Sequence, residues 1–329
     1  MSGPGRGQAW QALVPETLHD SVQEALSAVY GRLAFECLGP VTGGASGALA
    51  LRLRQGGRDR LMRVETGKMP MRNPHQYTCM EIAAQAGVAP ALHYVDAEAG
   101  VAVMDFVPTV PLDQYPGGQE ALARALGALA RDLQATAPFP ELFDFRGLTG
   151  RLLAVAESRS EPGLLDRHRA ALERLTATLD WDSAAHVSSH NDPNPRNVLF
   201  DGERLWLIDW ESACRNDAYV DLAIMADAMA GTPAVKRVLF DAWLGRAARA
   251  AETERLERVI VLTRLYYACL LFAVAGPSDD TLTDLSAPTP EAFQAQLAGA
   301  TIPTPQILQT LARMRLRDFL EGWNALEGT

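Results

Sequence analysis

The sequence predicts an α+β protein with two lobes, a small β-rich N-terminal lobe and a larger, mostly helical C-terminal lobe. Leucines alternate with other residues over 49–53 and two glycines follow at 56–57, a pattern that is typical of a β-hairpin. From about residue 107 onward, most apolar residues recur at the three- and four-residue spacing of helices. We therefore expect an N-terminal lobe over residues 1–106, a helical C-terminal lobe over residues 107–329, and a cleft between them.

Each remaining element follows from a local signal. An apolar stripe predicts a helix from Thr17, and Asn73 is placed to cap a second helix whose first turn contains a proline. The apolar run over 100–106 predicts a further strand. Residues 119–134 and 164–179 each carry one continuous apolar face, as expected of helices that pack on a core.

The charge and cysteine content narrow the classes of function. The formal net charge of -10 argues against a nucleic-acid binder, which needs a basic face to neutralise phosphates. It is compatible with a cationic substrate or a metal–nucleotide complex. The four cysteines are scattered without a CxxC pair, so neither a zinc site nor a disulfide framework is expected, and a reduced, cytoplasmic compartment is the default.

The hydropathy pattern gives no sign of a membrane segment. The first residues lack the long apolar run of a signal peptide. The most apolar late stretch, residues 265–276, is shorter than the roughly 20 residues that span a bilayer and is typical of a buried helix. We expect neither a membrane nor a nucleic acid as partner, and the sequence makes no prediction of oligomeric state.

The segment HNDPNPRN, residues 190–197, carries the strongest chemical signal. Asp192 and Asn197 are five residues apart, and the prolines between them stiffen the backbone and disfavour a helix. Asp209 lies twelve residues after Asn197 at the end of LWLID, and a hairpin through FDGERL would bring the two together. This offers one carboxylate to a substrate hydroxyl and two oxygen ligands to a cation such as Mg²⁺. The alternative is a proline- and asparagine-rich turn with a capping aspartate.

The spacing H-x-D-x-x-x-x-N followed by I-D resembles the catalytic signature of the aminoglycoside phosphotransferase and choline kinase superfamily, which has the protein-kinase-like fold. The resemblance implies that Asp192 is the catalytic base and that Asn197 and Asp209 are Mg²⁺ ligands. It implies that His190 is the structural histidine that braces the catalytic loop. It also implies that Asp221 is the structural aspartate that holds this loop.

The resemblance also places the nucleotide against the N-terminal lobe. It implies that TGGASGA, residues 42–48, covers ATP, because backbone N–H groups of a glycine-rich hairpin can approach phosphates. The residues expected there are Gly43, Gly44, Ser46 and Gly47. Taken alone, the same segment is equally typical of a β-turn.

A kinase of this fold needs a cation on its third strand, paired with a helix glutamate. The matching position holds Arg63 in place of the usual lysine, and Glu81 is its expected partner. The alternative is a purely structural ion pair. The element MRVETG around Arg63 favours the choline kinase-like branch. The segment VMDFVP matches the hinge, so the backbone of Asp105 and Val107 is expected to bind adenine.

These features predict an ATP- and Mg²⁺-dependent small-molecule kinase that transfers the γ-phosphoryl group to an alcohol hydroxyl. Asn191 replaces the arginine of the protein-kinase HRD motif and no A-P-E motif follows, which favours a small acceptor over a peptide. A choline- or ethanolamine-like cation would need aromatic and acidic neighbours. Glu211 and Tyr219 are the candidates near the site. The tail adds the aromatic residues Trp243, Tyr266, Tyr267 and Trp323.

Besides a small-molecule carrier or structural protein with a coincidental motif, two other functions remain open. One is an aminoglycoside or other antibiotic O-phosphotransferase, which would need an acidic cleft and is equally compatible with the negative net charge. The other is a nucleotide-binding regulator with weak catalysis, suggested by Arg63 in place of lysine. The presence of Asp192 counts against a regulator, because nucleotide binding alone needs no base.

Overall fold

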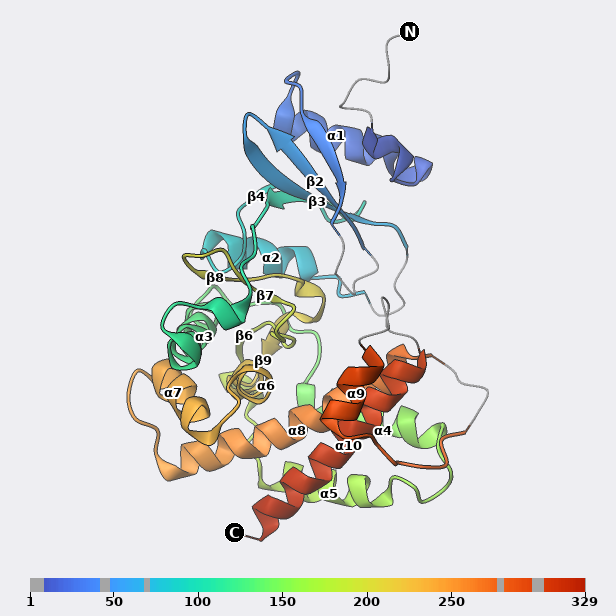
Figure 1. Cartoon of the computed structure of the whole chain (residues 1–329), viewed down its shortest axis with the longest axis vertical. Helices are drawn as coiled ribbons and strands as arrows, with labels where there is room; N and C mark the ends of the chain where they lie inside the picture. Colours follow the sequence, from blue (N-terminus) through green and yellow to red (C-terminus); the bar gives the residue numbers. More distant parts are fainter. Residues whose placement is uncertain (1–8, 42–47, 68–71, 277–280, 298–304, 329) are drawn as a thin grey trace.

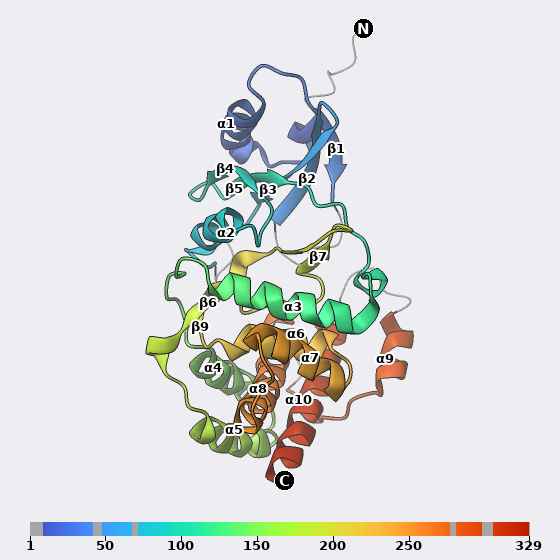
Figure 2. The same cartoon turned by 90° about the vertical axis from the view of Figure 1, so that its left-hand side faces the viewer.

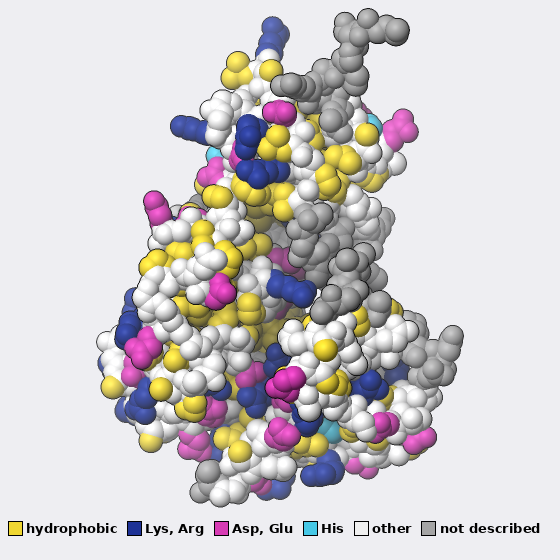
Figure 3. All heavy atoms as spheres, viewed as in Figure 1, with side chains coloured by type: hydrophobic (Ala, Val, Ile, Leu, Met, Phe, Trp, Pro, Cys, Tyr) yellow, Lys and Arg dark blue, Asp and Glu magenta, His cyan; other side chains and the backbone are white. Residues whose placement is uncertain are grey.

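The computed structural model describes residues 9–41, 48–67, 72–276, 281–297 and 305–328. A β-sheet forms one end of the molecule and helices form the other (Figure 1), so the predicted α+β class with two lobes is confirmed. Among the described residues, no helix is both long and apolar enough to cross a membrane. On the face drawn in Figure 3, acidic and basic side chains are interspersed over both lobes.

The N-terminal sheet has five antiparallel strands in the order β1-β2-β3-β5-β4. The strands are β1 Glu36–Pro40, β2 Ala48–Gln55, β3 Arg58–Glu65, β4 Leu92–Asp96 and β5 Val101–Asp105. Helices α1 (His19–Tyr30) and α2 (Gln76–Gln85) lie on opposite sides of this sheet (Figure 2). The predicted hairpin is confirmed, with Gln55 paired to Arg58 across the two glycines.

The alternation of side chains along β3 divides the sheet into two faces. Met62 and Val64 are fully buried in the core that includes α1. Leu61, Arg63 and Glu65 therefore point to the opposite side, toward α2 and the helical lobe. Arg63 consequently enters the region between the two lobes.

The C-terminal lobe consists of helices around a long central one. These helices are α3 Gly118–Gln134, α4 Phe145–Ser158, α5 Asp166–Thr178, α6 Tyr219–Met229, α7 Pro233–Leu244, α8 Ala250–Val274, α9 Pro290–Leu297 and α10 Pro305–Glu327. Helix α8 packs against α4, α6 and α10. The predicted burial of its apolar late stretch is confirmed for the first half, up to Cys269, whereas the residues from Leu270 onward are half-buried and Val274 is exposed. The short 3-10 helices are η1 Ala9–Ala12, η2 Glu16–Leu18, η3 Leu112–Gln114, η4 Ser183–Ala185 and η5 Trp210–Ser212.

Two small two-stranded sheets frame the segment HNDPNPRN, residues 190–197, which is the candidate catalytic segment. Strand β6 (Val187–Ser189) pairs with β9 (Cys214–Asn216), and β7 (Val198–Phe200) pairs with β8 (Leu205–Leu207). The segment 190–197 connects β6 to β7 and is thereby anchored at both ends.

Helix α2 belongs to the N-terminal lobe by sequence but shares the core of the helical lobe. Its buried residues Tyr77, Met80 and Ala83 lie in the same apolar cluster as α3 and α8. The helix begins at Gln76, and Asn73 caps the turn before it: the Asn73 side-chain oxygen accepts from the His75 N–H at 2.8 Å. The amide group of Asn73 also donates to the Ala213 carbonyl at 2.7 Å, which ties this turn to the helical lobe. The division of the chain at residue 106 stays a prediction.

The first helix also begins later than expected. Thr17 lies in η2, and α1 starts only at His19. The His19 ring is 3.0 Å from the Val14 carbonyl, a contact that favours the turn before the helix.

Candidate active site

A buried carboxylate holds the candidate catalytic segment in place. Asp221, in the first turn of α6, accepts the backbone N–H groups of His190 at 2.8 Å and Asn191 at 2.7 Å. Asn191 has a left-handed backbone with φ 62°, a conformation that a residue adopts only where its surroundings enforce it. Burial raises the pKa of Asp221 to about 6. This is the bracing contact that the sequence led us to expect of Asp221.

The side chain of His190 also braces this segment. Its ring nitrogen Nε2 donates to the Ile208 carbonyl at 2.8 Å, and its ring centroid is 4.7 Å from that of Trp210. Burial lowers the pKa of His190 to about 4, so the ring is neutral near neutral pH. A fully buried neutral imidazole suits a structural role better than proton exchange with a substrate.

Asp192 sits at the centre of a set of hydrogen-bond donors. Tyr267 Oη donates to Asp192 Oδ1 at 2.5 Å, and Asn194 Nδ2 donates to the same oxygen at 2.9 Å. Asn197 Nδ2 lies 3.2 Å from Oδ2 and 2.9 Å from the Asp192 carbonyl. Burial raises the pKa of Asp192, and the three donors act against that rise. A carboxylate held in this way can receive a proton from an approaching hydroxyl group.

The hairpin β7–β8 brings Asp209 beside Asn197, as predicted. The Ile208 N–H donates to the Asn197 carbonyl at 3.0 Å, which extends the ladder to the residue before Asp209. Asp209 has a left-handed backbone with φ 66°, and its Oδ1 is buried without a hydrogen-bond partner among the described residues. Burial raises the pKa of Asp209, while Arg63 lowers it. An orphaned buried oxygen at a strained position is available to bind a ligand.

The donor set around Asp209 fits Mg²⁺. The Asn197 amide nitrogen is turned to Asp192, which leaves the amide oxygen for another ligand. In the part of the chain that the structure describes, no three His, Cys, Asp or Glu side chains could hold a metal by themselves. Mg²⁺ is commonly bound through one or two protein oxygens together with substrate phosphates. Asn197 and Asp209 fit that mode.

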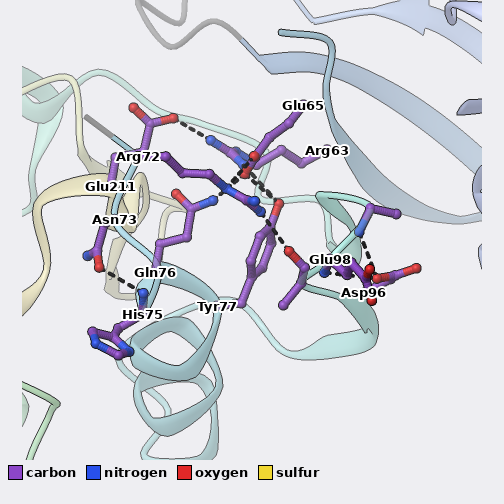
Figure 4. A network of polar contacts seen from close by, with 12 residues as sticks. Arg63, Glu65, Arg72, Asn73, His75, Gln76, Tyr77, Asp96, Glu98 and Glu211 are labelled. Atoms are coloured by element: carbon purple, nitrogen blue, oxygen red, sulfur yellow. Dashed lines mark hydrogen bonds and ion pairs between the residues drawn. The ribbon is translucent and has the colours of Figure 1, made fainter. Parts of the chain in front are cut away.

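Arg63 lies at the meeting point of the lobes (Figure 4). Its guanidinium donates to Glu65 at 2.8 Å, to Tyr77 at 3.1 Å, and to Glu211 of η5. The Arg63 side chain is only 14% exposed. Arg63 is thus held by one carboxylate from its own strand, β3, and by one carboxylate from the helical lobe.

The expected pair of Arg63 with Glu81 was wrong. Glu81 is exposed, and the carboxylates that contact Arg63 are Glu65 and Glu211. Tyr77, in the first turn of α2, already contacts the guanidinium, and Glu81 lies a full turn further along the helix. Arg63 is therefore paired with carboxylates, but they come from β3 and η5 and not from α2.

The Glu65 carboxylate contacts four donor side chains. Its Oε1 accepts from Arg63, from Tyr77 at 2.8 Å and from Gln76, and its Oε2 lies 2.8 Å from Arg72 Nε. Figure 4 shows these side chains converging on the Glu65 carboxylate. Sequence reasoning missed this residue, because its only signal was its position two residues after Arg63 on the same face of the strand.

The two residues expected near the acceptor have other contacts. Burial raises the pKa of Glu211, which binds Arg63 across the lobes. Tyr219 is 7% exposed and packs against Phe240 and Trp243, with the Arg255 guanidinium 4.4 Å from its ring centroid. The assignment of Tyr219 to the substrate is therefore corrected, since its ring belongs to the core.

Most of the aromatic side chains of the tail also belong to the core. Trp243 donates to Gln134, and Tyr266 packs on Phe145 with ring centroids 4.3 Å apart. Trp323 is 6% exposed and lies under Arg174. Tyr267 is the member of the set that contacts Asp192. Helical periodicity alone could not separate it from its neighbour Tyr266.

The structure describes only some of the residues that are expected to bind the nucleotide. Gly43, Gly44, Ser46 and Gly47 lie outside the described residues. Asp105 ends β5, and its side chain lies 2.6 Å from His93 Nε2. Val107 follows outside any strand, and its N–H has no partner among the described residues.

A comparison with protein families settles the class of the chain. The model of the phosphotransferase enzyme family matches residues 38–256. The chain belongs to this family. The predicted superfamily and the prediction of a phosphotransferase are thereby confirmed. A search of curated proteins finds no match to this phosphotransferase.

Solved structures share the fold of this phosphotransferase at low sequence identity. A choline/ethanolamine kinase family protein from Mesorhizobium loti superposes with a TM-score of 0.60 at 22% identity, over 95% of this chain and 100% of that one. Choline kinase LicA from Streptococcus pneumoniae gives a TM-score of 0.64 at 15% identity, over 94% and 100%. A spectinomycin phosphotransferase in complex with ADP and spectinomycin gives 0.56 at 14% identity, over 94% and 98%.

Proposed function

We propose that this phosphotransferase transfers the γ-phosphoryl group of ATP to the hydroxyl of a small alcohol, in a reaction that depends on Mg²⁺. The observation that carries the proposal is the placement of Asp192 on a braced loop, next to the hairpin that holds Asn197 and Asp209. A base beside two oxygen ligands for a cation is the arrangement that phosphoryl transfer to an alcohol requires.

Each residue has a defined part in the proposed reaction. Asp192 orients the acceptor hydroxyl and takes its proton. Asn197 and Asp209 hold Mg²⁺, which supplies charge neutralisation at the phosphates when it is bound. Arg63 binds phosphate oxygens with its planar fork of donors. The backbone of Asp105 and Val107 binds adenine, and the glycine-rich segment 42–48 binds the phosphates.

The acceptor we propose first is an amino alcohol of the choline or ethanolamine kind. Its support is the likeness in fold to proteins named as choline and choline/ethanolamine kinases. An aminoglycoside or similar polyhydroxylated acceptor is the second candidate. One observation favours the second: Trp243, Tyr266 and Trp323 are used in the core, and a polyhydroxylated acceptor needs no aromatic cage.

The test is Mg²⁺-dependent ATP consumption over a panel of choline, ethanolamine, aminoglycosides, spectinomycin and simple sugars. We expect one class of acceptor to yield a phosphorylated product by mass spectrometry. Asp192→Asn should lower its formation by about 10²- to 10⁴-fold, the usual contribution of a positioned base. Asp113→Asn removes an exposed carboxylate of η3 and should leave the rate unchanged. ATP binding without a phosphorylated product from any acceptor would favour the nucleotide-binding regulator instead.

A further inference from the structure

The Asp192 carboxylate has a partner that lies far from the catalytic segment in the chain. Tyr267 lies on α8, 75 residues away, and its hydroxyl is 2.5 Å from Asp192 Oδ1. Helix α8 is the central helix of the lobe and packs against α4, α6 and α10 (Figure 1). The ring of Tyr267 is set edge-on to that of Tyr266, with centroids 5.4 Å apart. The hydroxyl is thus presented to Asp192 from a rigid part of the fold.

The two oxygens of the carboxylate are unequally occupied. An ionised carboxylate offers about four lone-pair sites, two on each oxygen. Oδ1 receives Tyr267 at 2.5 Å and Asn194 at 2.9 Å, so both of its sites are filled. Among the described residues, Oδ2 receives only Asn197, at 3.2 Å. Oδ2 therefore keeps an open site.

We propose that Tyr267 is a positioning residue for phosphoryl transfer, which fixes the rotation of the Asp192 carboxylate so that Oδ2 faces the acceptor. The inference rests on the proposed function. In the step it serves, the acceptor O–H bond breaks and its proton goes to Asp192 Oδ2. The acceptor oxygen bonds to the γ-phosphorus, and the bond from that phosphorus to the bridging oxygen breaks, with its electron pair leaving on ADP.

The chemistry of tyrosine suits this task. The torsion that turns an aspartate carboxylate is broad, so without a strong partner on one oxygen the carboxylate could turn and direct its open site away from the acceptor. Burial and the negative charge of Asp192 raise the pKa of Tyr267 far above its ordinary value. The hydroxyl consequently stays protonated and acts as a donor. A phenylalanine would preserve the packing of the ring and remove only the hydrogen bond.

The experiment compares Tyr267→Phe with Tyr266→Phe, the same substitution one position earlier. Tyr266 is 3% exposed and packs on Phe145. We expect Tyr267→Phe to lower kcat by about tenfold or more, the loss expected for a hydrogen bond to a charged group. The KM for ATP should stay within about twofold, because Arg63 and Asp209 are untouched. Tyr266→Phe should retain the activity of the unmodified enzyme.

A double-mutant comparison separates positioning from a general effect on the fold. In the Asp192→Asn background, Tyr267→Phe should cause no further loss, because the carboxylate on which it acts is gone. An unchanged kcat in Tyr267→Phe would overturn the inference and leave the proposed function standing. An equal fractional loss in both backgrounds would likewise overturn it. If the unmodified enzyme phosphorylates no acceptor, the proposed function fails, and this inference fails with it.

Discussion

Replacement of Glu65 by glutamine tests how Arg63 is held. The substitution preserves the shape of the side chain and removes its charge, while Arg63, Arg72, Gln76 and Tyr77 keep pointing at it. Loss of one partner of a buried ion pair costs about 3–5 kcal/mol. The Arg63 and Glu65 side chains are 14% and 15% exposed, and Arg63 keeps its contact with Glu211. We therefore expect the free energy of unfolding to fall by less, about 2 kcal/mol.

The same change should also weaken nucleotide binding. Arg63 held by one carboxylate in place of two is less well positioned for phosphate oxygens, and we expect the Kd for Mg·ATP to rise about tenfold. Urea unfolding measures the first effect, and isothermal titration calorimetry measures the second.

Glu81→Gln is the matched control, since Glu81 is the partner that the kinase resemblance assigns to Arg63. It is exposed, so its unfolding free energy should change by no more than about 0.5 kcal/mol. If Glu81→Gln proved the more damaging of the two changes, the network of Figure 4 would not describe how Arg63 is held.

Four further substitutions test the metal site, a buried histidine and the packing of two helices. Asp209→Ala should abolish the Mg²⁺ dependence of nucleotide binding in calorimetry, and an unchanged dependence would remove Asp209 from the metal site. Burial lowers the pKa of His168 to about 4 in the folded protein, whereas in the unfolded chain this pKa keeps its ordinary value near 6.5. As the pH falls below 6.5, the unfolded chain therefore takes up a proton that the folded protein does not. Stability should drop by about 3 kcal/mol between pH 6.5 and 4, and His168→Phe should flatten that slope in urea titrations. A Cβ at Gly127 of α3 would collide with the Leu239 carbonyl of α7, whereas Gly150 of α4 faces open space. Gly127→Ala should therefore lower the melting temperature, and Gly150→Ala should raise it by the few degrees that about 0.5–1 kcal/mol of helix propensity provides.

The catalytic segment could be predicted because its geometry is local. Asn197 and Asp209 are joined by a short hairpin, so their spacing in sequence fixes their spacing in space. The contact of Asp221 with the loop was likewise expected from its place in the motif. The fold class followed from the change in apolar periodicity near residue 107.

The partners of Arg63 and Asp192 could not be predicted because they depend on how separate elements pack. Glu81 is on the correct helix, but the turn that meets Arg63 carries Tyr77. Two adjacent tyrosines on α8 are equivalent in sequence, and only the packing of that helix sends the hydroxyl of Tyr267 to Asp192. Tertiary contacts decide which of two neighbouring side chains faces the site, and helical periodicity in the sequence does not distinguish them.

A single-turnover experiment tests the central claim most directly. Enzyme in excess over γ-labelled ATP would be mixed with Mg²⁺ and the acceptor that the panel identifies, and the label would be followed into product. We predict rapid transfer to the acceptor hydroxyl by the unmodified enzyme. Asp192→Asn should bind the nucleotide equally well and transfer the label at least about a hundredfold more slowly. Equal rates in the two proteins would show that Asp192 is not the base and would contradict the mechanism.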